Sequence, residues 1–271
     1  MANILDQIVE TKRGELRAAM ARRPLADLKA AVRDLPPPRG FYAAIAAPPQ
    51  RGIHLIAEIK RRSPSAGLIR PDFDPVRIAS IYHGAGASCL SVLTDETYFD
   101  GRLEYVDQVR SAVPLPVLRK DFIIDAYQVY EARAAGADAV LLIGEVLPAS
   151  RLKELLDLAF ELGLTSLIEV HEPETLDELR AVVRFPNDKR SLLGVNNRNL
   201  KIQRTDLATF EKLSARVAGT LLVAESGIRT PADVQRMIAA GARALLVGES
   251  LMRSPDIAAA IEVLLGPSPG L

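Results

Sequence analysis

Short runs of consecutive hydrophobic residues recur along the chain from Ile53 onward, and a longer amphipathic segment separates each run from the next. The runs are rich in Val, Ile and Leu and do not alternate strictly with polar residues, which is typical of strands covered on both faces. Eight strands are predicted in this way, at residues 53–59, 88–94, 116–120, 139–143, 166–170, 192–196, 221–226 and 244–248.

Helical segments fill the intervals between these runs. Asp74, Asp125, Thr230 and Ser254 are predicted to start helices, because a side-chain oxygen there satisfies the free N–H groups of a first turn. Residues 150–162 place their leucines on one stripe at helical spacing. Eight strand–helix units without a long structureless loop favour an α/β fold of the closed parallel type, the (β/α)8 or TIM barrel, over an open doubly wound sheet.

The first part of the chain follows a different pattern. An amphipathic stripe that begins with Ile4, Leu5 and Ile8 predicts a helix, and two proline-rich connectors follow it. We therefore expect a single domain over residues 1–271, in which residues 1–50 form an N-terminal helical extension and residues 51–271 form the barrel. The pattern leaves open whether the extension closes the bottom of the barrel or contributes to its mouth.

Charge and composition narrow the choice of partners. The 34 Lys and Arg residues balance the 34 Asp and Glu residues, so the chain has no long-range field to attract a polyanion, and we expect no nucleic-acid partner. The lone Cys89 cannot form an internal disulfide and fits a reducing compartment. Acidic residues near the N-terminus argue against a targeting peptide, and no apolar run approaches the ~18 residues that span a bilayer. We expect a cytoplasmic protein with no membrane partner.

Polar side chains stand at the carboxyl ends of the predicted strands, where barrels of this class hold their functional groups. Glu58 and Lys60 end the first strand, and because side chains alternate along a strand the two share one face. Other strand ends carry Arg119, Lys120, Asp121, Glu169, Asn196, Asn197, Arg198 and Glu225. One buried charge is more often part of a structural ion pair. Five strands ending in polar groups that point at one cavity predict a general acid–base site.

The last two strands end in small residues. Ser226 and Gly227 follow the seventh strand, and Gly248 and Ser250 follow the eighth. Backbone N–H groups and hydroxyls at these two strands form the usual phosphate site of such barrels, so we predict a phosphate cradle here. The alternative is that the glycines serve only as turns between strand and helix.

Aromatic and histidine residues near the predicted strand ends are further candidates for the site. Phe99 and Phe122 come just after the second and third strands, where they would suit an aromatic wall for a substrate, although such residues more often belong to the core. No second histidine stands at metal-ligand spacing from His54, His83 or His171, so no metal site is predicted.

Five ordered segments resemble the signature segments of the indole-3-glycerol phosphate synthase family. They are residues 58–65 (EIKRRSPS), 118–123 (LRKDFI), 168–171 (IEVH), 194–200 (GVNNRNL) and 224–228 (AESGI). The resemblance extends from the N-terminal extension to the last strand. One departure is Ala66, where the family often has a basic residue; we expect it to alter a mobile loop and to leave the acid and base in place.

The resemblance implies a carboxy-lyase of tryptophan biosynthesis. Its phosphorylated small-molecule substrate would be 1-(2-carboxyphenylamino)-1-deoxyribulose 5-phosphate, cyclised to indole-3-glycerol phosphate with loss of carbon dioxide and water, and no metal or organic cofactor is implied. By the same resemblance Lys120 is the general acid, Glu169 transfers protons in the dehydration, and Lys60 binds the anionic substrate and helps to expel the hydroxyl. Residues that would orient the lysines and the substrate are Glu58, Asn196, Arg198 and Glu225; those that would approach the phosphate are Ser63, Ser226, Gly227, Gly248 and Ser250.

Three alternatives stay open at this point. The chain could be another phosphate-binding barrel such as phosphoribosylanthranilate isomerase, or an aldolase that uses Lys60 or Lys120 as a Schiff-base nucleophile. It could also be a barrel that binds a phosphosugar without catalysis. We expect a monomer, and weak homo-oligomer formation is left open.

Overall fold

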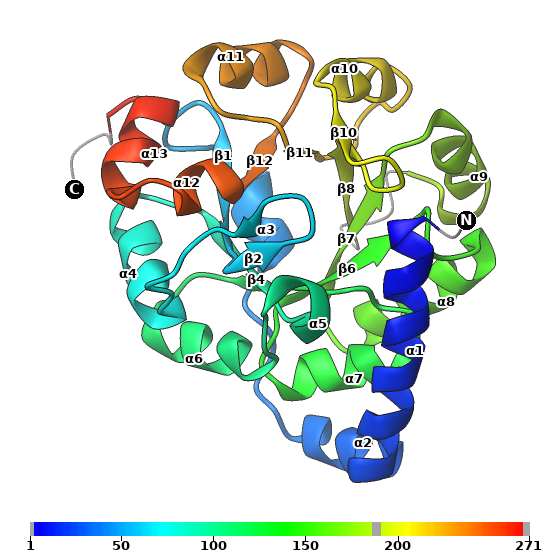
Figure 1. Cartoon of the computed structure of the whole chain (residues 1–271). Coiled ribbons are helices and arrows are strands. Elements are labelled where there is room, and N and C mark those ends of the chain that lie inside the picture. Colours follow the sequence, from blue (N-terminus) through cyan, green and yellow to red (C-terminus); the bar gives the residue numbers. More distant parts are fainter. Residues whose placement is uncertain (1–2, 186–190, 268–271) are drawn as a thin grey trace.

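The computed structural model describes residues 3–185 and 191–267, in which eight strands close into a barrel with every neighbouring pair parallel (Figure 1). Around the barrel these strands are β1 (His54–Ile59), β12 (Ala244–Val247), β11 (Leu222–Glu225), β8 (Ser191–Asn196), β7 (Thr165–Val170), β6 (Ala139–Ile143), β5 (Val117–Lys120) and β4 (Cys89–Leu93). All eight predicted strands are confirmed to within one residue at each end, and so is the (β/α)8 fold.

Helices surround the strands as a ring, and two short hairpins stand at the carboxyl ends of β1 and β8 (Figure 1). The hairpins are β2 (Arg62–Ser63) with β3 (Gly67–Leu68), and β9 (Arg198–Asn199) with β10 (Arg204–Thr205). The helices are α1 (Ile4–Arg22), α2 (Leu25–Arg33), α3 (Phe41–Ala46), α4 (Pro75–Gly84), α5 (Glu96–Phe99), α6 (Glu104–Ala112), α7 (Ala126–Ala134), α8 (Ala149–Glu161), α9 (Pro173–Val183), α10 (Ala208–Ser214), α11 (Pro231–Ala239), α12 (Glu249–Met252) and α13 (Ile257–Leu265).

Three of the four predicted helix starts are confirmed. Asp74, Asp125 and Thr230 each cap a helix through the side chain. The start predicted at Ser254 is wrong by two residues: α13 is capped instead by Asp256, whose Oδ1 accepts the N–H of the third helical residue at 3.0 Å. A carboxylate at that position reaches a free first-turn N–H group, whereas the Ser254 hydroxyl donates to the Asp256 carbonyl.

Alternation along the strands divides the hydrophobic core into an inner and an outer layer. The lumen is filled by side chains that include Ile56, Cys89, Leu118, Leu141 and Leu167. Their neighbours in the strands pack outward against the helices. Because the lumen is packed with apolar side chains along most of its length, charged groups find room only at the end where the strands stop.

The N-terminal extension reaches both ends of the barrel. The α3 residues Phe41 and Ile45 are fully buried against the residues that begin the strands, so α3 closes the bottom. At the opposite end α1 contributes Leu5 and Ile8 to the inner apolar cluster near the mouth (Figure 1). Both roles that the sequence left open are therefore filled, each by a different helix.

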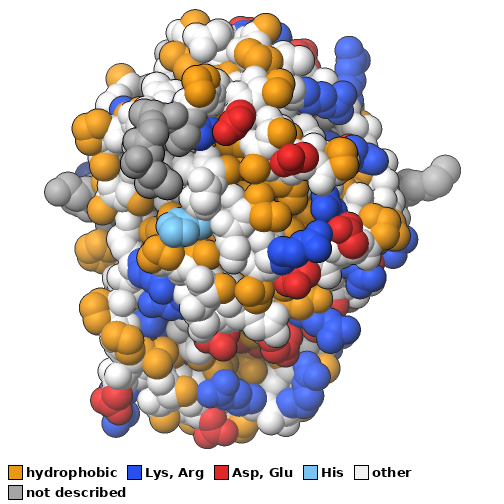
Figure 2. All heavy atoms as spheres, turned by 90° about the vertical axis from the view of Figure 1, so that its left-hand side faces the viewer, with side chains coloured by type: hydrophobic (Ala, Val, Ile, Leu, Met, Phe, Trp, Pro, Cys, Tyr) orange, Lys and Arg blue, Asp and Glu red, His pale blue; other side chains and the backbone are white. Residues whose placement is uncertain are grey.

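The outer surface carries charges of both signs. Figure 2 shows the face on the left of Figure 1, where acidic and basic side chains are interspersed over the part that the structure describes. Binding of a polyanion calls for a basic patch or stripe, which this face does not present. In the described ranges no helix is both long and apolar enough to cross a membrane.

Candidate active site

A lysine and two carboxylates meet at the mouth end of the lumen. The Lys120 Nζ, at the end of β5, donates to Glu169 Oε2 of β7 at 3.0 Å and to Glu225 Oε2 of β11 at 2.7 Å. Asn196, at the end of β8, donates from its side-chain amide to Glu169 Oε1 at 3.0 Å. Because each residue occupies a lumen-facing position at a strand end, strands far apart in the chain bring these four groups together.

The two carboxylates have different proton affinities. Burial raises the pKa of Glu225 to about 8, despite the opposing charge of Lys120. Burial also acts on Glu169, but there Lys120 and the Asn196 amide outweigh it and lower the pKa of the carboxyl. The Lys120 ammonium loses hydration, yet Glu169 and Glu225 raise its pKa well above the ordinary value. Near neutral pH the cluster therefore contains an ammonium, a carboxylate and a neutral carboxyl group, which is a combination suited to proton transfer.

A second ion pair stands beside the first. Glu58 and Lys60 of the β1 end are buried and bonded to each other, which confirms that they share the lumen face. Two glycines leave space for the carboxylates of Glu58 and Glu225. A Cβ at Gly248 would collide with the Glu58 carboxylate, and a Cβ at Gly194 would collide with that of Glu225.

A polar cavity opens next to these ion pairs, at the ends of β11 and β12. It is lined by the predicted residues Ser226, Gly227, Gly248 and Ser250, and by the cationic side chains Lys60, Arg198 and Arg229 among others. Gly227 has a φ of +80°, and a side chain there would contact Thr205. Small residues and cations on one wall give a phosphate group both close access to the backbone and charge compensation.

An apolar cavity adjoins the polar one. The rings of Phe99 and Phe122 stand on its wall with their centroids 6.2 Å apart, and Leu5 and Ile8 of α1 also line it. Lys120 lies on the wall of both cavities, as do Lys60 and Glu58. The ion pairs therefore separate a space suited to an anion from a space suited to an aromatic ring.

The structure corrects part of the strand-end prediction. Arg119 and Asn197 do not point into the lumen, because each stands one position away from a lumen-facing residue. Arg119 donates to Asp121 and to the Gln128 carbonyl, and the Asn197 amide donates to the Ser226 carbonyl. The prediction that every polar strand end points at one cavity is therefore wrong for Arg119 and Asn197.

One predicted phosphate residue lies elsewhere. Ser63 lines the apolar cavity, where its Oγ accepts the Ala66 N–H at 3.2 Å, and it is not among the residues of the polar cavity. Arg229, in the polar cavity, was missed by the sequence analysis, whereas a contribution of the extension to the mouth had been left open and is made by α1 on the wall of the apolar cavity. The signal for α1 was its amphipathic stripe, which predicted the helix but not the surface that it covers.

Metal ligands do not gather in the described residues: no group of three or more His, Cys, Asp and Glu side chains there is arranged to hold a metal ion. His54 instead bonds the Ser88 hydroxyl at 2.8 Å and the Ala47 carbonyl at 2.8 Å, and His171 bonds the Asn196 carbonyl at 2.6 Å. Both histidines hold connecting segments in place.

A closed (β/α)8 barrel with charged groups and two cavities at the carboxyl ends of its strands has the architecture of a barrel enzyme, whose site lies at that end. Solved structures with the same fold include thiamine phosphate pyrophosphorylase from Pyrococcus furiosus, with a TM-score of 0.56 and 20% identity over 79% of this chain and 95% of that one. A mutant tryptophan synthase alpha-subunit from the same organism has a TM-score of 0.58 and 14% identity, over 80% of this chain and 99% of that one. At these identities the likeness concerns the fold alone.

Sequence comparison is more specific. The family model for indole-3-glycerol phosphate synthase matches residues 5–264. Proteins of that name from Rhodopirellula baltica and Azospirillum brasilense are 52% and 50% identical to this chain, over 97% and 98% of it and over 98% and 100% of their own lengths. The chain belongs to the indole-3-glycerol phosphate synthase family. The resemblance stated from its five segments is thereby confirmed.

Proposed function

We propose that this protein cyclises 1-(2-carboxyphenylamino)-1-deoxyribulose 5-phosphate to indole-3-glycerol phosphate, with release of carbon dioxide and water. The observation that carries the proposal is the place of Lys120 on the wall shared by the polar and apolar cavities. A substrate with a phosphate at one end and a carboxyphenyl ring at the other then has its reacting carbons between the two ends, at the ammonium group.

Ring closure needs an acid at the ketone oxygen. The ring carbon that bears the carboxylate attacks the ketone carbon, a carbon–carbon bond forms, and the former carbonyl oxygen takes a proton from the Lys120 ammonium. The carboxylate then leaves as carbon dioxide, and its bonding electrons restore the aromatic ring. A preorganised cation where negative charge develops on oxygen contributes several kcal/mol in a site that excludes water.

Dehydration completes the reaction. The new hydroxyl leaves as water with a proton supplied by an acid, while a proton is removed from the adjacent carbon to form the indole double bond. Glu169, whose carboxylate is held by Asn196 and Lys120, serves these proton transfers, and Lys60 assists the departure of the hydroxyl. Glu58 orients Lys60, and Glu225 orients Lys120.

The remaining residues bind the two ends of the substrate. Ser226, Gly227, Gly248 and Ser250 approach the phosphate, and Arg198 stands beside them with one nitrogen 2.7 Å from Ser65 Oγ and another 3.2 Å from Glu249. Phe99 and Phe122 hold the carboxyphenyl ring, so that the reacting carbons stay close together. In the same proposal the protein acts as a monomer in the cytoplasm.

The charge state of Lys120 argues against the aldolase alternative. A Schiff base forms from a neutral amine, whereas the acidic groups around Lys120 raise the pKa of its ammonium well above the ordinary value and keep it protonated. Borohydride in the presence of a carbonyl substrate is therefore expected to leave the protein without a trapped adduct.

The test is incubation with the proposed substrate while indole fluorescence and released carbon dioxide are followed together. The chain has no tryptophan, so product fluorescence is free of the usual protein background. We expect both signals in equal amounts, and a loss of about 10²-fold or more in kcat for Glu169→Gln, since general acid–base groups contribute on this scale. Glu161→Gln, on the exposed end of α8, is the matched control.

Each alternative gives a different result in this assay. An isomerase releases no carbon dioxide, and a phosphosugar-binding barrel gives neither signal although it binds the compound. Either result from a folded preparation would refute the proposal.

A further inference from the structure

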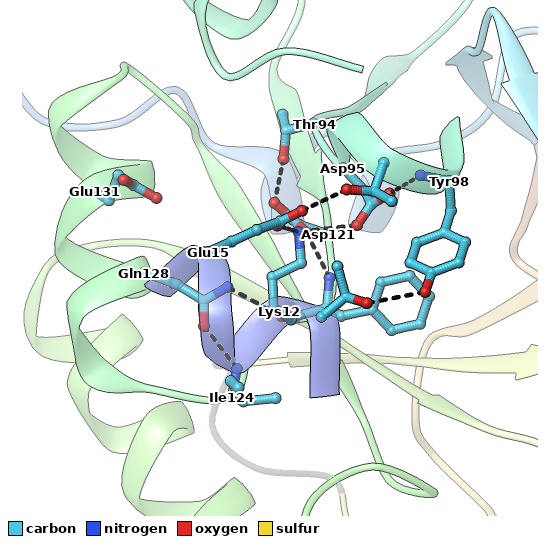
Figure 3. Close-up of polar contacts among 12 residues, drawn as sticks. Lys12, Glu15, Thr94, Asp95, Tyr98, Asp121, Ile124, Gln128 and Glu131 are labelled. Carbon is cyan, nitrogen blue, oxygen red and sulfur yellow. Dashed lines mark hydrogen bonds and ion pairs between the residues drawn. The ribbon is translucent and has the colours of Figure 1, made fainter. Parts of the chain in front are cut away.

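Lys12 is a buried lysine that lies outside the catalytic cluster. Although it belongs to the helical extension, it is only 4% exposed, and its Nζ lies 2.9 Å from Asp95 Oδ2, 2.9 Å from Asp121 Oδ1 and 2.7 Å from Glu15 Oε2. Figure 3 shows Asp95 and Asp121, from the segments that follow β4 and β5, beside Lys12 and Glu15 of α1. Lys12 is not among the described residues that line the polar or the apolar cavity.

Each of the two aspartates holds the backbone beside one wall of the apolar cavity. Asp95 caps α5, and its Oδ1 accepts the Tyr98 N–H at 2.8 Å, one residue before Phe99. Asp121 Oδ1 accepts the N–H of Phe122 itself at 2.8 Å. A single ammonium group therefore joins the two segments that carry Phe99 and Phe122, whose ring centroids lie 6.2 Å apart.

Other contacts fix the same arrangement. Thr94 donates to Asp121 Oδ2 at 2.6 Å and Arg119 donates to the same oxygen at 3.0 Å, so that the orientation of the Asp121 carboxylate is set on both sides. On α5, Thr97 donates to Glu15 at 2.8 Å (Figure 3 labels Glu15). Both α5 and the segment at Asp121 are thus bonded to α1. A shift of α1 would therefore move the rings of Phe99 and Phe122.

A buried ion pair is weak evidence for stability, because desolvation offsets much of the attraction between the charges. A buried ion pair is better suited to holding the surrounding segments in one of several possible arrangements. Here that arrangement is the separation of the two rings, since Lys12 reaches both of the carboxylates that hold their backbone.

We propose that Lys12 is a positioning residue that sets the separation of Phe99 and Phe122 and thereby the affinity of the site for the carboxyphenyl ring. The inference rests on the proposed function, because the ring is part of the proposed substrate. Lys12 does not touch that substrate and acts through Asp95 and Asp121.

The decisive measurement separates binding of the ring from binding of the phosphate. In Lys12→Met we expect kcat/KM to fall about tenfold, since displaced rings bind the substrate less tightly and hold its reacting carbons less close together. The affinity for anthranilate, read from its own fluorescence in a protein without tryptophan, is expected to fall about as much. The constant for inhibition by inorganic phosphate should stay within about twofold, because the phosphate cavity does not involve Lys12.

Three further variants test whether the effect comes from the charge of Lys12 and its partners. Lys12→Arg keeps the charge and is expected to restore most of the anthranilate affinity. Arg13→Met removes an exposed cation on the same helix, which is paired with Glu10, and should leave the anthranilate affinity unchanged. Should Lys12→Met fold poorly, the double variant Lys12→Met with Asp95→Asn is used instead. It removes the negative charge of Asp95, which would lack its lysine partner, and keeps a side chain that can cap α5. It is expected to show the same selective loss.

Two results would overturn the inference: an unchanged anthranilate affinity in a folded Lys12→Met variant, or equal losses of anthranilate and phosphate affinity, which indicate general destabilisation. Anthranilate binding needs no turnover, so these results are distinct from failure of the proposed function. That failure would appear as absence of indole product from the wild-type protein.

Discussion

Lys120 in the lumen and Lys12 on α1 have similar immediate surroundings. Each ammonium lies within 3.0 Å of carboxylates from two other elements of the barrel, and each lysine has a raised pKa because those carboxylates outweigh its burial. The two lysines differ in whether the side chain reaches a cavity. Lys120 lines both cavities, whereas Lys12 stands behind their walls. The two ion pairs alone therefore do not separate the roles proposed for Lys120 and Lys12; the difference is that the Lys120 side chain itself lines the cavities.

The acids also differ between the lumen cluster (Lys120, Glu169 and Glu225) and the α1 cluster (Lys12, Asp95 and Asp121). Burial raises the pKa of Glu225 to about 8, while Arg119 and Lys12 overcome burial at Asp121 and hold the pKa of that carboxyl at about 2. The lumen cluster therefore carries a proton that can move near neutral pH. The cluster at α1 carries fixed charges, as expected of a group that maintains geometry.

Removal of the lumen ammonium should have the largest effect. In Lys120→Met we expect kcat to fall by about 10³-fold or more, because the acid for ring closure and the charge beside the developing alkoxide are lost together. Steady-state kinetics on a variant with a wild-type circular dichroism spectrum is the measurement. Lys153→Met, on an exposed pair of α8, is the control. A smaller loss here than in Lys12→Met would reverse the roles assigned to the two lysines.

Asp121 of the α1 cluster is also expected to make the stability of the protein depend on pH. The folded pKa of Asp121 lies below its ordinary value of 3.8, so the ionised form stabilises the folded protein above about pH 4, and this contribution is lost as the pH falls toward 2. The difference corresponds to about 2 kcal/mol. Asp121→Asn is therefore expected to lower the free energy of unfolding by about that amount at pH 7 and by much less near pH 2. Urea unfolding at both pH values measures it, and an equal loss at both would contradict the ionic explanation.

The third effect concerns the pH dependence of activity. Glu225 loses its proton as the pH rises through about 8, and a second negative charge beside Lys120 then makes that ammonium a weaker acid. Wild-type kcat/KM should therefore fall about tenfold between pH 8 and pH 9.5. Glu225→Gln keeps a neutral group at this position, so its profile should remain flat over the same range. If the decline persists unchanged in the variant, another group titrates there.

The local order of residues was sufficient to predict the strands, one pair of site residues and several helix starts. Continuous apolar runs placed all eight strands, because a strand covered on both faces needs apolar side chains whatever its neighbours are. Period-2 alternation placed Glu58 and Lys60 on one face, and capping side chains at Asp74, Asp125 and Thr230 marked helix starts, since a cap bonds an N–H only two or three residues away.

Other features depended on groups that are distant in the chain. No local pattern pairs Lys12 with Asp121, 109 positions further on, or assigns Leu5 to the wall of the apolar cavity. The different proton affinities of Glu169 and Glu225 likewise arise from one shared lysine and from their burial, and a sequence shows neither. Propensity, alternation and capping act over a few residues, whereas ion pairing and desolvation depend on distances that exist only once the barrel has closed and α1 has packed onto it.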